Sequence, residues 1–428
     1  MSGAGSGGAG RGAAAGVVIL GGGQAGIQLA DSLRAEGYPG AIDVFASETH
    51  LPYQRPPLSK DFIAEGADAS ALPLRADRFF SELDVTFHPG VTVSSLDRSA
   101  RTVTTDTGEV FAYDVLVFAT GARNRRLSIE GADLAGVHYL RTLDDAQELR
   151  EELASARSAL VVGGGFIGLE FAAGAAARGL DVTVLEQGER IMGRVLTPPM
   201  SSHFAGLHGA ERIDIRLGEG IVALQGGGGP GGGRVTAGVG AGGEVYPADI
   251  VVVGIGVLPN AELADAAGLT VTNGIVVDAF LRTSDPSIYA IGDCCSYPNA
   301  HTGTMTRLES VQNAVDQAKV LAKTLTGTPI EYVELPWFWS QQGANKLQIA
   351  GMVDVAATTF TRGDPASGKF SVFCFRGDTL LGVESVNSTA DHLAARRILG
   401  NRLPLTPAQA VDPAFDLKAY SRAAVAAA

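Results

Sequence analysis

A chain of 428 residues, of which 46% are hydrophobic and 18% charged, is long enough for two or three globular domains with substantial cores. Its formal net charge of -13 argues against a general binder of nucleic acids or anionic membranes. No apolar run approaches the roughly 20 residues that a transmembrane helix needs. The three cysteines, Cys294, Cys295 and Cys374, are too few and odd in number for a disulfide framework, and they suit a reducing cytoplasm.

The first predicted elements form one nucleotide-binding unit. Residues 1–15 are rich in Gly, Ala and Ser and lack the apolar core of a signal peptide, so we expect a disordered leader. Residues 17–46 predict a strand, a helix and a strand, because an apolar run leads directly into a glycine-rich turn. A further strand is predicted over residues 111–120, and the irregular polar stretch that follows it marks a domain boundary near residue 123.

The later elements predict a second unit of the same kind and then a different domain. Residues 158–186 repeat the pattern of strand, helix and strand. Residues 226–243 are so rich in glycine that we expect the tip of a flexible hairpin. Strands are predicted at 250–255 and at 289–293. Beyond about residue 330 both tryptophans appear and strand-like alternation begins, which predicts an α+β domain.

Two glycine fingerprints of one kind carry the chemistry. They are Gly21-x-Gly23-x-x-Gly26 and Gly163-x-Gly165-x-x-Gly168. In such a turn the first glycine permits the tight bend, the second lets a pyrophosphate approach the backbone, and the third lets the helix pack on the strand. The N–H groups at the helix N-terminus then bind the phosphates. A single fingerprint also occurs in glycine turns without ligand, but two of them followed by acids predict two dinucleotides on one chain.

An acidic residue follows each fingerprint by about 20 residues, at the end of another apolar run. Glu48 is the candidate partner of the first ribose, and Glu186 of the second. A carboxylate at residue 186 can accept hydrogen bonds from the ribose hydroxyls of NADH and would repel the 2′-phosphate of NADPH. Arg190 is the one nearby residue whose positive charge would favour the 2′-phosphate of NADPH instead. The sequence therefore favours NADH at the second site.

Chain order indicates which dinucleotide belongs to which unit. The turns Ala119-Thr120-Gly121 and Gly292-Asp293 end strands on either side of the second fingerprint, so the second unit is inserted within the first. Such insertion is typical of flavoproteins that hold two dinucleotides, and it assigns FAD to the first unit. Asp293 is well placed for the sugar-alcohol chain and phosphate region of FAD, with a plain helix cap as the alternative. The expected domains are the leader at 1–15, an FAD domain at 16–122 and 247–330, an NADH domain at 123–246 and a C-terminal α+β domain at 331–428.

Five motifs in order resemble those of the FAD-dependent NADH:ferredoxin reductases of bacterial oxygenase systems, over about residues 16–420. The motifs are LPYQRPPLSK at 51–60, YLRTLDDA at 139–146, GGGFIGLE at 163–170, RLESVQNA at 307–314 and PWFWS at 336–340. The resemblance implies an α/β fold with two Rossmann-like, glutathione-reductase-like nucleotide domains and the C-terminal α+β domain. It also implies tightly bound FAD, NADH as substrate and a [2Fe–2S] ferredoxin as the electron acceptor.

The resemblance also implies site residues, position by position. Lys60 matches a residue near flavin N5, Val93 a backbone contact to adenine, and Glu170 a carboxylate near the nicotinamide. The expected FAD-binding residues are Gly21, Gly23, Ala25, Gly26, Ser47, Glu48, Arg55, Lys60, Val93, Ala119, Thr120, Gly121, Arg141, Asp293 and Val311. The expected NADH-binding residues are Gly163, Gly165, Phe166, Ile167, Gly168, Glu186 and Gly256.

The chain departs from the family pattern at two places. Ser47 stands where several members carry the ribose acid, with Glu48 adjacent, so both residues stay open as the ribose contact. Gln341-Gln342 stands where the usual pattern is Asp-Gln.

Lys60, Glu170 and Trp339 are the expected catalytic residues. A charged lysine beside flavin N5 stabilises the negative charge that arrives with hydride. Since a buried unpaired lysine is costly, we predict an ion pair between Lys60 and Glu170. Trp339 could line the flavin and the surface where electrons leave. The alternatives are a surface lysine after a proline-rich turn and a tryptophan of the core.

The sequence lacks the residues that would let the chain itself accept electrons from the flavin. Residues 1–293 contain no cysteine, and a disulfide between the adjacent Cys294 and Cys295 would be strained. The sequence shows neither a four-cysteine set for an iron–sulfur cluster nor the His/Cys spacing of a zinc site, so we expect no metal. Flavin electrons must therefore leave to an external acceptor, and a one-electron iron–sulfur partner suits FAD.

The expected partner is a [2Fe–2S] ferredoxin that feeds a haem monooxygenase. Such ferredoxins are usually acidic, as this chain is, so docking requires a local basic face. By position and by resemblance the candidates are Lys319, Arg396, Arg397 and Lys418, with solvated surface charges as the alternative. The rival functions are a related flavoprotein that reduces rubredoxin, a dioxygenase ferredoxin or a quinone, and a flavin-bearing signalling protein with slow turnover. Neither a nucleic acid nor a membrane is expected as a partner.

Overall fold

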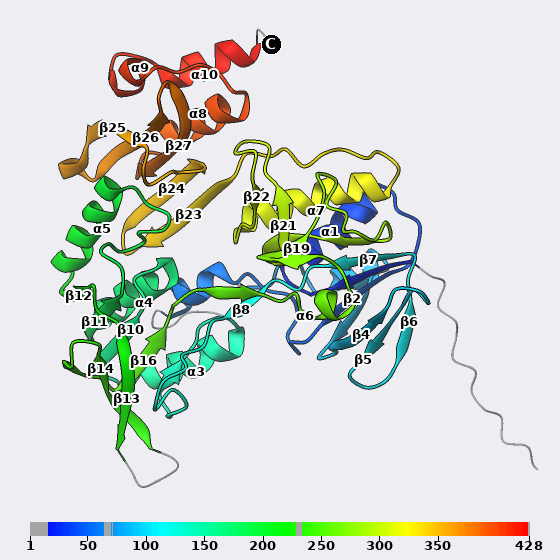
Figure 1. The fold of residues 1–428 in the computed structure, drawn as a ribbon, viewed down its shortest axis with the longest axis horizontal. Coiled ribbons are helices and arrows are strands. Elements are labelled where there is room, and N and C mark those ends of the chain that lie inside the picture. Colours follow the sequence, from blue (N-terminus) through cyan, green and yellow to red (C-terminus); the bar gives the residue numbers. More distant parts are fainter. Residues whose placement is uncertain (1–15, 64–69, 71, 228–232, 427–428) are drawn as a thin grey trace, which may run out of the picture.

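The computed structural model describes residues 16–63, 70, 72–227 and 233–426. The leader expected at 1–15 and the tip of the glycine-rich hairpin lie outside the described residues. Figure 1 shows two nucleotide domains side by side, with the C-terminal domain above them. Among the described helices, none is long and apolar enough to cross a membrane.

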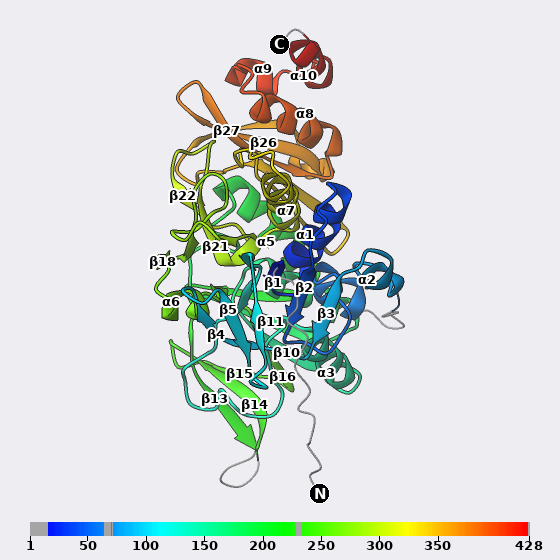
Figure 2. The ribbon, with the colours of Figure 1, turned by 90° about the vertical axis from the view of Figure 1, so that its right-hand side faces the viewer.

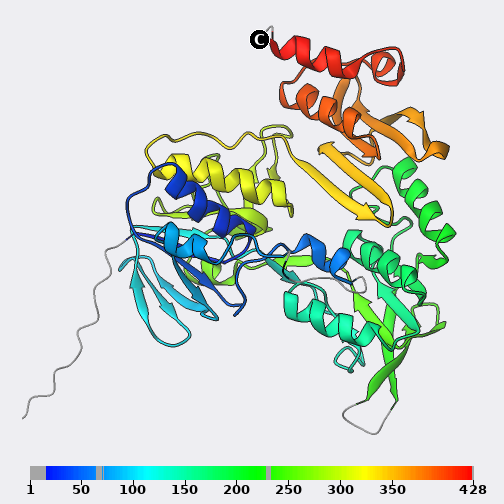
Figure 3. The ribbon, with the colours of Figure 1, turned by 180° about the vertical axis from the view of Figure 1, so that it is seen from behind.

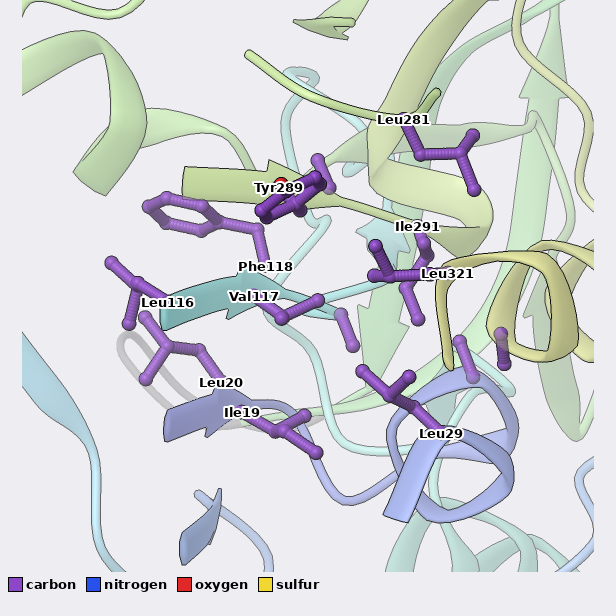
Figure 4. Close-up of a cluster of buried hydrophobic side chains, with 14 of the residues drawn as sticks. Ile19, Leu20, Leu29, Leu116, Val117, Phe118, Leu281, Tyr289, Ile291 and Leu321 are labelled. Atoms are coloured by element: carbon purple, nitrogen blue, oxygen red, sulfur yellow. The ribbon is translucent and has the colours of Figure 1, made fainter. Parts of the chain in front are cut away.

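The first nucleotide domain is built on a parallel sheet with the strand order β20-β7-β1-β2-β3. These strands are β1 (Val17–Leu20), β2 (Ile42–Ala46), β3 (Thr86–Pro89), β7 (Val115–Phe118) and β20 (Ile288–Ala290). The residues of β1 are all buried, as expected for a parallel strand that is covered on both faces. Helices α1 (Gln24–Ala35) and α7 (Val311–Leu325) pack against each other beside the sheet (Figure 2). Figure 4 shows Leu29 of α1 and Leu321 of α7 gathered with Ile19, Val117 and Ile291 of the sheet region.

The strand predicted over residues 111–120 is two strands. β6 (Val110–Ala112) pairs with β5 (Thr102–Thr105) in an antiparallel sheet, whereas β7 joins the parallel sheet. The chain leaves one sheet and enters the other at residues 113–114, where the Asp114 N–H donates to the carbonyl of Gly16.

Shorter elements surround this core. They are α2 (Arg78–Glu82), α6 (Glu262–Ala266), the sheet of β4 (Val93–Asp97), β5 (Thr102–Thr105) and β6, and the sheet of β18 (Val271–Thr272), β19 (Gly274–Val276), β21 (Cys295–Pro298) and β22 (Met305–Thr306).

The second nucleotide domain repeats this plan with the parallel order β12-β11-β10-β16-β9. Its strands are β9 (Val137–His138), β10 (Ser158–Val162), β11 (Asp181–Glu186), β12 (Ile213–Leu217) and β16 (Ile250–Val253), and its helices are α3 (Leu143–Leu153), α4 (Phe166–Ala177) and α5 (Pro198–Ala210). The glycine-rich segment forms part of an antiparallel hairpin of β13 (Ile221–Gly227) and β14 (Arg234–Gly240), which β15 (Val245–Pro247) extends. This hairpin points away from the other domains (Figure 1).

Strand pairing corrects one expected domain boundary. We expected the chain to return to the FAD domain at residue 247, but β16 pairs in parallel with β10 and therefore completes the second sheet. Its four residues are all buried and fill the place beside the strand of the second fingerprint. The chain crosses between the domains at β8 (Ala122–Asn124) and β17 (Val257–Pro259), which pair with each other in antiparallel fashion.

The C-terminal domain is an antiparallel sheet with the order β23-β24-β27-β26-β25. Its strands are β23 (Trp337–Gln342), β24 (Asn345–Gly351), β25 (Thr358–Asp364), β26 (Lys369–Arg376) and β27 (Thr379–Val386), and its helices are α8 (Thr389–Gly400), α9 (Pro407–Val411) and α10 (Leu417–Ala426). One set of its apolar residues, including Phe373 and Val383, packs against α8. Another set, including Leu347 and Val372, joins the core that contains Phe204 of α5. The sheet therefore rests directly on the second nucleotide domain, as Figure 3 shows from behind.

Candidate functional site

The first glycine turn leaves open space at the N-terminus of α1. Gly21 has a φ of +124°, and a β-carbon there would lie 2.1 Å from the carbonyl oxygen of Ala119. A β-carbon on Gly26 would lie 2.0 Å from the carbonyl oxygen of Gly21, so glycine is required where helix and strand meet. Gly23 directly precedes α1 and faces open space. As the N-cap residue it offers no side chain that could accept hydrogen bonds from the first N–H groups of the helix. Uncapped N–H groups beside open space fit the pyrophosphate of a dinucleotide.

The second glycine turn has the same geometry. Gly163 has a φ of +108°, and a β-carbon there would lie 2.5 Å from the carbonyl oxygen of Gly254. A β-carbon on Gly168 would lie 2.4 Å from the carbonyl oxygen of Gly163. Helix α4 begins after Gly165 without a side-chain cap. The two turns are therefore equivalent, and both fit a dinucleotide.

The residues that follow these turns differ between the domains. Glu186 ends β11, where its Oε2 accepts from the Gly164 N–H at 2.7 Å and its Oε1 accepts from the Gly188 N–H at 2.7 Å. By strand register the corresponding residue of the first sheet is Ala46, one residue past the partner of Leu20. Ser47 and Glu48 thus lie beyond the end of β2, Ser47 exposed and Glu48 partly buried. The carboxylate that lies next to the glycine turn in the second domain has no equivalent at that position in the first.

In the first domain, two neighbouring side chains donate hydrogen bonds to the carboxylate of Glu48. Its Oε1 accepts from Arg55 at 2.5 Å, and its Oε2 accepts from the hydroxyl of Tyr53. Arg55 also donates to the carbonyl of Arg141 at 2.6 Å. Burial is the main reason why the pKa of Tyr53 is raised, and the bond to Glu48 adds to it.

Arg141 joins this group to the strand end that carries Asp293. Its guanidinium lies 3.3 Å from the Asp293 carboxylate and 3.5 Å from where a β-carbon on Gly121 would be. Asp293 lies in a short 3₁₀ turn, Gly292–Cys294, and Gly292 lies against Ala25 of α1. The fold thus brings together, from separate segments of the chain, residues that the sequence assigned to one site.

The remaining expected FAD residues lie around this group. The Thr120 hydroxyl donates to the carbonyl of Asn260 at 2.6 Å, in the crossover to the second domain. Val93 begins β4 and packs against the core of the first domain, and Val311 begins α7 after its cap, Ser310.

Lys60 and Glu170 form the predicted ion pair, which confirms that prediction. Nζ of Lys60 donates to Oε2 of Glu170 at 2.7 Å. The hydroxyl of Ser59 donates to the same oxygen at 2.5 Å, and the hydroxyl of Ser340 donates to Oε1 at 2.5 Å. The Glu170 side chain is 4% exposed and that of Lys60 17%. One buried carboxylate thereby receives donors from the first nucleotide domain and from the C-terminal domain.

Sequence reasoning missed the two serines, although both stand in the motifs that it used. Ser59 directly precedes Lys60, the last residue of the motif at 51–60, and Ser340 ends the motif at 336–340 beside Trp339. Their adjacency to expected site residues was the available signal.

Trp339 lies in β23 as part of an aromatic cluster. Its ring centroid is 5.6 Å from that of Trp337, and the guanidinium of Arg396 lies 4.2 Å over the Trp337 ring. The imidazole of His392 lies edge-on to Trp337 at 6.0 Å. Burial, aided by Arg396 and Lys346, lowers the pKa of His392 to about 4, so this ring is neutral near pH 7.

The four expected docking residues differ in their exposure. Lys319 of α7, Arg397 of α8 and Lys418 of α10 are exposed. Arg396 is only partly exposed, because its guanidinium is stacked on Trp337.

A polar pocket of about 240 Å³ opens where the crossover strand β17 meets both nucleotide domains. Gly256, expected at the NADH site, lines it with a φ of +100°. Arg125, Arg194 and Arg307 also line it, and the sequence reasoning did not single them out. Arg125 belongs to the irregular polar stretch that marked the domain boundary, so its charge was a usable signal.

The three cysteines are free and buried. Burial raises the pKa of each thiol, which disfavours the reactive thiolate. Over the described part of the chain, no cluster of three or more His, Cys, Asp or Glu side chains could hold a metal ion.

Two family models match the chain. Residues 15–318 match the family described as pyridine nucleotide-disulphide oxidoreductase, and residues 337–421 match the family described as the reductase C-terminal domain. The second match begins at Trp337, the first residue of β23.

Proteins of known name or structure are similar to this chain over almost its full length. Rhodocoxin reductase of Rhodococcus erythropolis is 50% identical over 402 residues, which are 94% of this chain and 93% of that protein. The structure of the ferredoxin reductase for the CYP199A2 system from Rhodopseudomonas palustris is similar with a TM-score of 0.92 at 45% identity, covering 95% of this chain and 99% of that one. The reductase in the covalent putidaredoxin reductase–putidaredoxin complex is similar with a TM-score of 0.93 at 37% identity, covering 97% and 100%.

Proposed function

The chain belongs to the pyridine nucleotide-disulphide oxidoreductase family, and from this premise we propose that it is the NADH-dependent reductase of a ferredoxin that supplies a haem monooxygenase. It is an FAD-dependent oxidoreductase that takes hydride from NADH and passes electrons to a ferredoxin. FAD, when bound, supplies a centre that accepts two electrons as hydride and releases them one at a time. The chain itself binds the two dinucleotides, positions charge and presents a docking face.

The state of the cysteines is the observation that best supports an external electron acceptor. Members of a disulphide oxidoreductase family need a reactive thiol pair to pass electrons to a disulphide. Here Cys294, Cys295 and Cys374 are buried and protonated, and the first two are adjacent in sequence. Electrons that enter by hydride transfer must therefore leave to an external acceptor.

We assign the first glycine turn, with Arg55, Arg141 and Asp293, to FAD. The uncapped N-terminus of α1 would bind the pyrophosphate, and the Arg141–Asp293 pair closes the same end of the sheet. Because Glu48 is already engaged by Arg55 and Tyr53, its role is to hold Arg55 in place, and direct ribose contact would require it to exchange those partners.

We assign the second glycine turn and Glu186 to NADH. The two backbone N–H groups hold the Glu186 carboxylate at the end of β11, where it would meet the adenosine ribose. Arg190, the residue that argued for NADPH, donates to the carbonyls of Leu196 at 3.0 Å and Gly193 at 3.1 Å. Its guanidinium is thus turned toward its own loop, which removes the main argument for a 2′-phosphate.

Lys60 would supply positive charge where hydride arrives, and Glu170 holds that charge in place. The ammonium is fixed by the carboxylate at 2.7 Å and by the carbonyl of Pro56 at 3.1 Å. A charge that is fixed before the reaction stabilises developing negative charge without reorganisation.

The aromatic cluster of Trp337 and Trp339 supports an exit for electrons at β23. Arg396 covers Trp337, and the exposed Arg397 extends the basic surface along α8. We propose that an acidic ferredoxin docks here with Lys319, Arg397 and Lys418 at the rim.

The proposal of a haem monooxygenase as the final electron acceptor rests on the similarity to the reductase of the CYP199A2 system. The test is reconstitution from purified components: NADH, this reductase, each [2Fe–2S] ferredoxin of the same genome, and each candidate oxygenase. We expect NADH-dependent reduction of a haem monooxygenase only when one particular ferredoxin is present.

Two other results would change the assignment. Efficient transfer only to a dioxygenase ferredoxin, a rubredoxin or a quinone would refute the monooxygenase link and leave the NADH-dependent reductase intact. Flavin that is reduced by NADH but is reoxidised slowly by every acceptor would favour the signalling protein.

A further inference from the structure

Three buried side chains lead from α5 to the carboxylate of Glu170. His208 Nε2 lies 3.2 Å from Gln342 Oε1, Gln342 Nε2 lies 2.8 Å from Ser340 Oγ, and Ser340 Oγ lies 2.5 Å from Glu170 Oε1. Ser340 is 0% exposed, Gln342 2% and His208 1%. The chain of contacts therefore runs through the interior, from the second nucleotide domain through β23 to the partner of Lys60.

The donor and the acceptor of each hydrogen bond in this series are determined by the chemistry of the groups involved. The Gln342 amide nitrogen also lies 3.4 Å from the carbonyl of Phe166, which can only accept, so the amide orientation is set independently. The nitrogen must then donate to Ser340, and the single hydroxyl proton of Ser340 is left to point at Glu170. At the other end the Gln342 carbonyl requires the proton of His208 on Nε2. The neutral tautomer is consistent with burial, which lowers the pKa of His208.

The effect of this arrangement falls on Glu170. Its Oε1 accepts from Ser340 while its Oε2 accepts from Lys60 and Ser59, so each oxygen has a fixed donor. A hydrogen bond to a carboxylate is stronger than one between neutral groups and favours the ionised form. The donor on Oε1 also prevents rotation of the carboxylate away from the ammonium of Lys60.

We propose that Ser340, oriented by Gln342, is a positioning residue for hydride acceptance, through which the C-terminal domain completes the Lys60–Glu170 pair. The inference rests on the proposed roles of Lys60 and Glu170. It assigns to the C-terminal domain a part in the first half of the reaction, in addition to a part in electron exit.

The test compares Ser340→Ala with Ser421→Ala. Ser421 is also fully buried in the C-terminal domain, but its hydroxyl donates to the backbone carbonyl of Lys418 at 3.0 Å instead of to a carboxylate. For Ser340→Ala we expect reduction of the bound flavin by NADH to slow about tenfold, the size of one charge-assisted hydrogen bond. Ser421→Ala should reduce at the wild-type rate.

A second measurement does not depend on activity. Loss of the Ser340 donor should destabilise the charged Glu170 more than a neutral side chain of the same shape. The difference in unfolding midpoint between wild type and Ser340→Ala should therefore be larger than the difference between Glu170→Gln and Glu170→Gln/Ser340→Ala, whereas Ser421→Ala should have the same effect in both backgrounds. The double variant Ser340→Ala/Gln342→Leu should reduce no more slowly than Ser340→Ala, because Gln342 acts through Ser340.

The outcomes separate the two hypotheses. If NADH does not reduce the flavin of the wild type, the proposed function fails. If it does, and Ser340→Ala keeps the wild-type rate and has the same effect on stability with Glu170 as with Gln at that residue, the positioning role of Ser340 is refuted.

Discussion

Nζ of Lys60 and Oε2 of Glu170 lie 2.7 Å apart, although 110 residues separate them in the chain. Lys60 follows the 3₁₀ turn Pro56–Ser59 of the first nucleotide domain, and Glu170 lies in α4 of the second. The pair therefore joins segments of two domains, and the turn that carries Lys60 packs directly against α4. Since each domain carries one glycine turn, the same contact joins the two expected dinucleotide sites.

Removal of Lys60 should be costly for both stability and rate. In Lys60→Met the buried Glu170 keeps its serine donors but loses its counter-charge, which should lower the free energy of unfolding by about 3 kcal/mol. Reduction of the flavin by NADH should slow at least tenfold, as measured by stopped-flow absorbance. The double variant Lys60→Met/Glu170→Gln should recover stability but not the rate. A single variant with wild-type stability would contradict the importance of the pair.

Glu186 should determine the preference for NADH. Glu186→Ser removes the carboxylate that would bind the ribose hydroxyls, and we expect the ratio of kcat/KM for NADH over NADPH to fall about tenfold or more. The matched control is Glu189→Ser, which removes an equal charge from an exposed neighbour. An equal effect of both variants would mean that only the overall charge of the loop matters.

The rim of the proposed docking face should control the rate of association with ferredoxin. Arg397→Glu and Lys418→Glu should each slow ferredoxin reduction several-fold at low salt, with a smaller effect at high salt, because rim charges act mainly on association. Ferricyanide reduction by NADH should be unchanged. Arg101→Glu, in the exposed turn between β4 and β5, serves as the control. Equal loss with both acceptors would point to damage at the flavin site.

Glu384 should make stability depend on pH. It is fully buried in β27, where its carboxylate accepts from the Thr197 N–H at 2.9 Å and from the Thr197 hydroxyl at 2.5 Å, just before α5. Burial raises the pKa of Glu384 from 4.5 to about 7, although the Thr197 donors and Arg190 act in the opposite direction. Because the folded state binds this proton more tightly, the stabilisation is complete below about pH 4.5 and is lost as the pH rises to about 7.

The measurement is the free energy of unfolding from pH 5 to 8. Relative to Glu384→Gln, the wild type should lose about 3 kcal/mol over this range, at about 1.4 kcal/mol for each pH unit between the two pKa values. Glu36→Gln, an exposed residue at the end of α1, should not alter the profile. Parallel profiles for wild type and Glu384→Gln would show that Glu384 stays ionised in the folded protein.

The two glycine turns and the strands that lead into them follow from the amino-acid sequence alone. Such features are local, because a fingerprint such as Gly21-x-Gly23-x-x-Gly26 dictates backbone conformation within a few residues. The same holds for Glu186, which ends a strand at a set distance from its turn. The Lys60–Glu170 pair was also predicted, although only because a family resemblance placed both residues near the flavin.

Tertiary structure alone decided which side chains share a contact. Strand pairing placed Ile250–Val253 in the second sheet, Glu48 found its partners in Arg55 and Tyr53, and the Arg396 guanidinium stacked on Trp337. Ser340 reaches Glu170 because burial of apolar surface between the C-terminal sheet and α5 brings β23 against α4. That docking depends on surfaces assembled from distant segments, and no local pattern in the sequence encodes the hydrogen bonds that it creates.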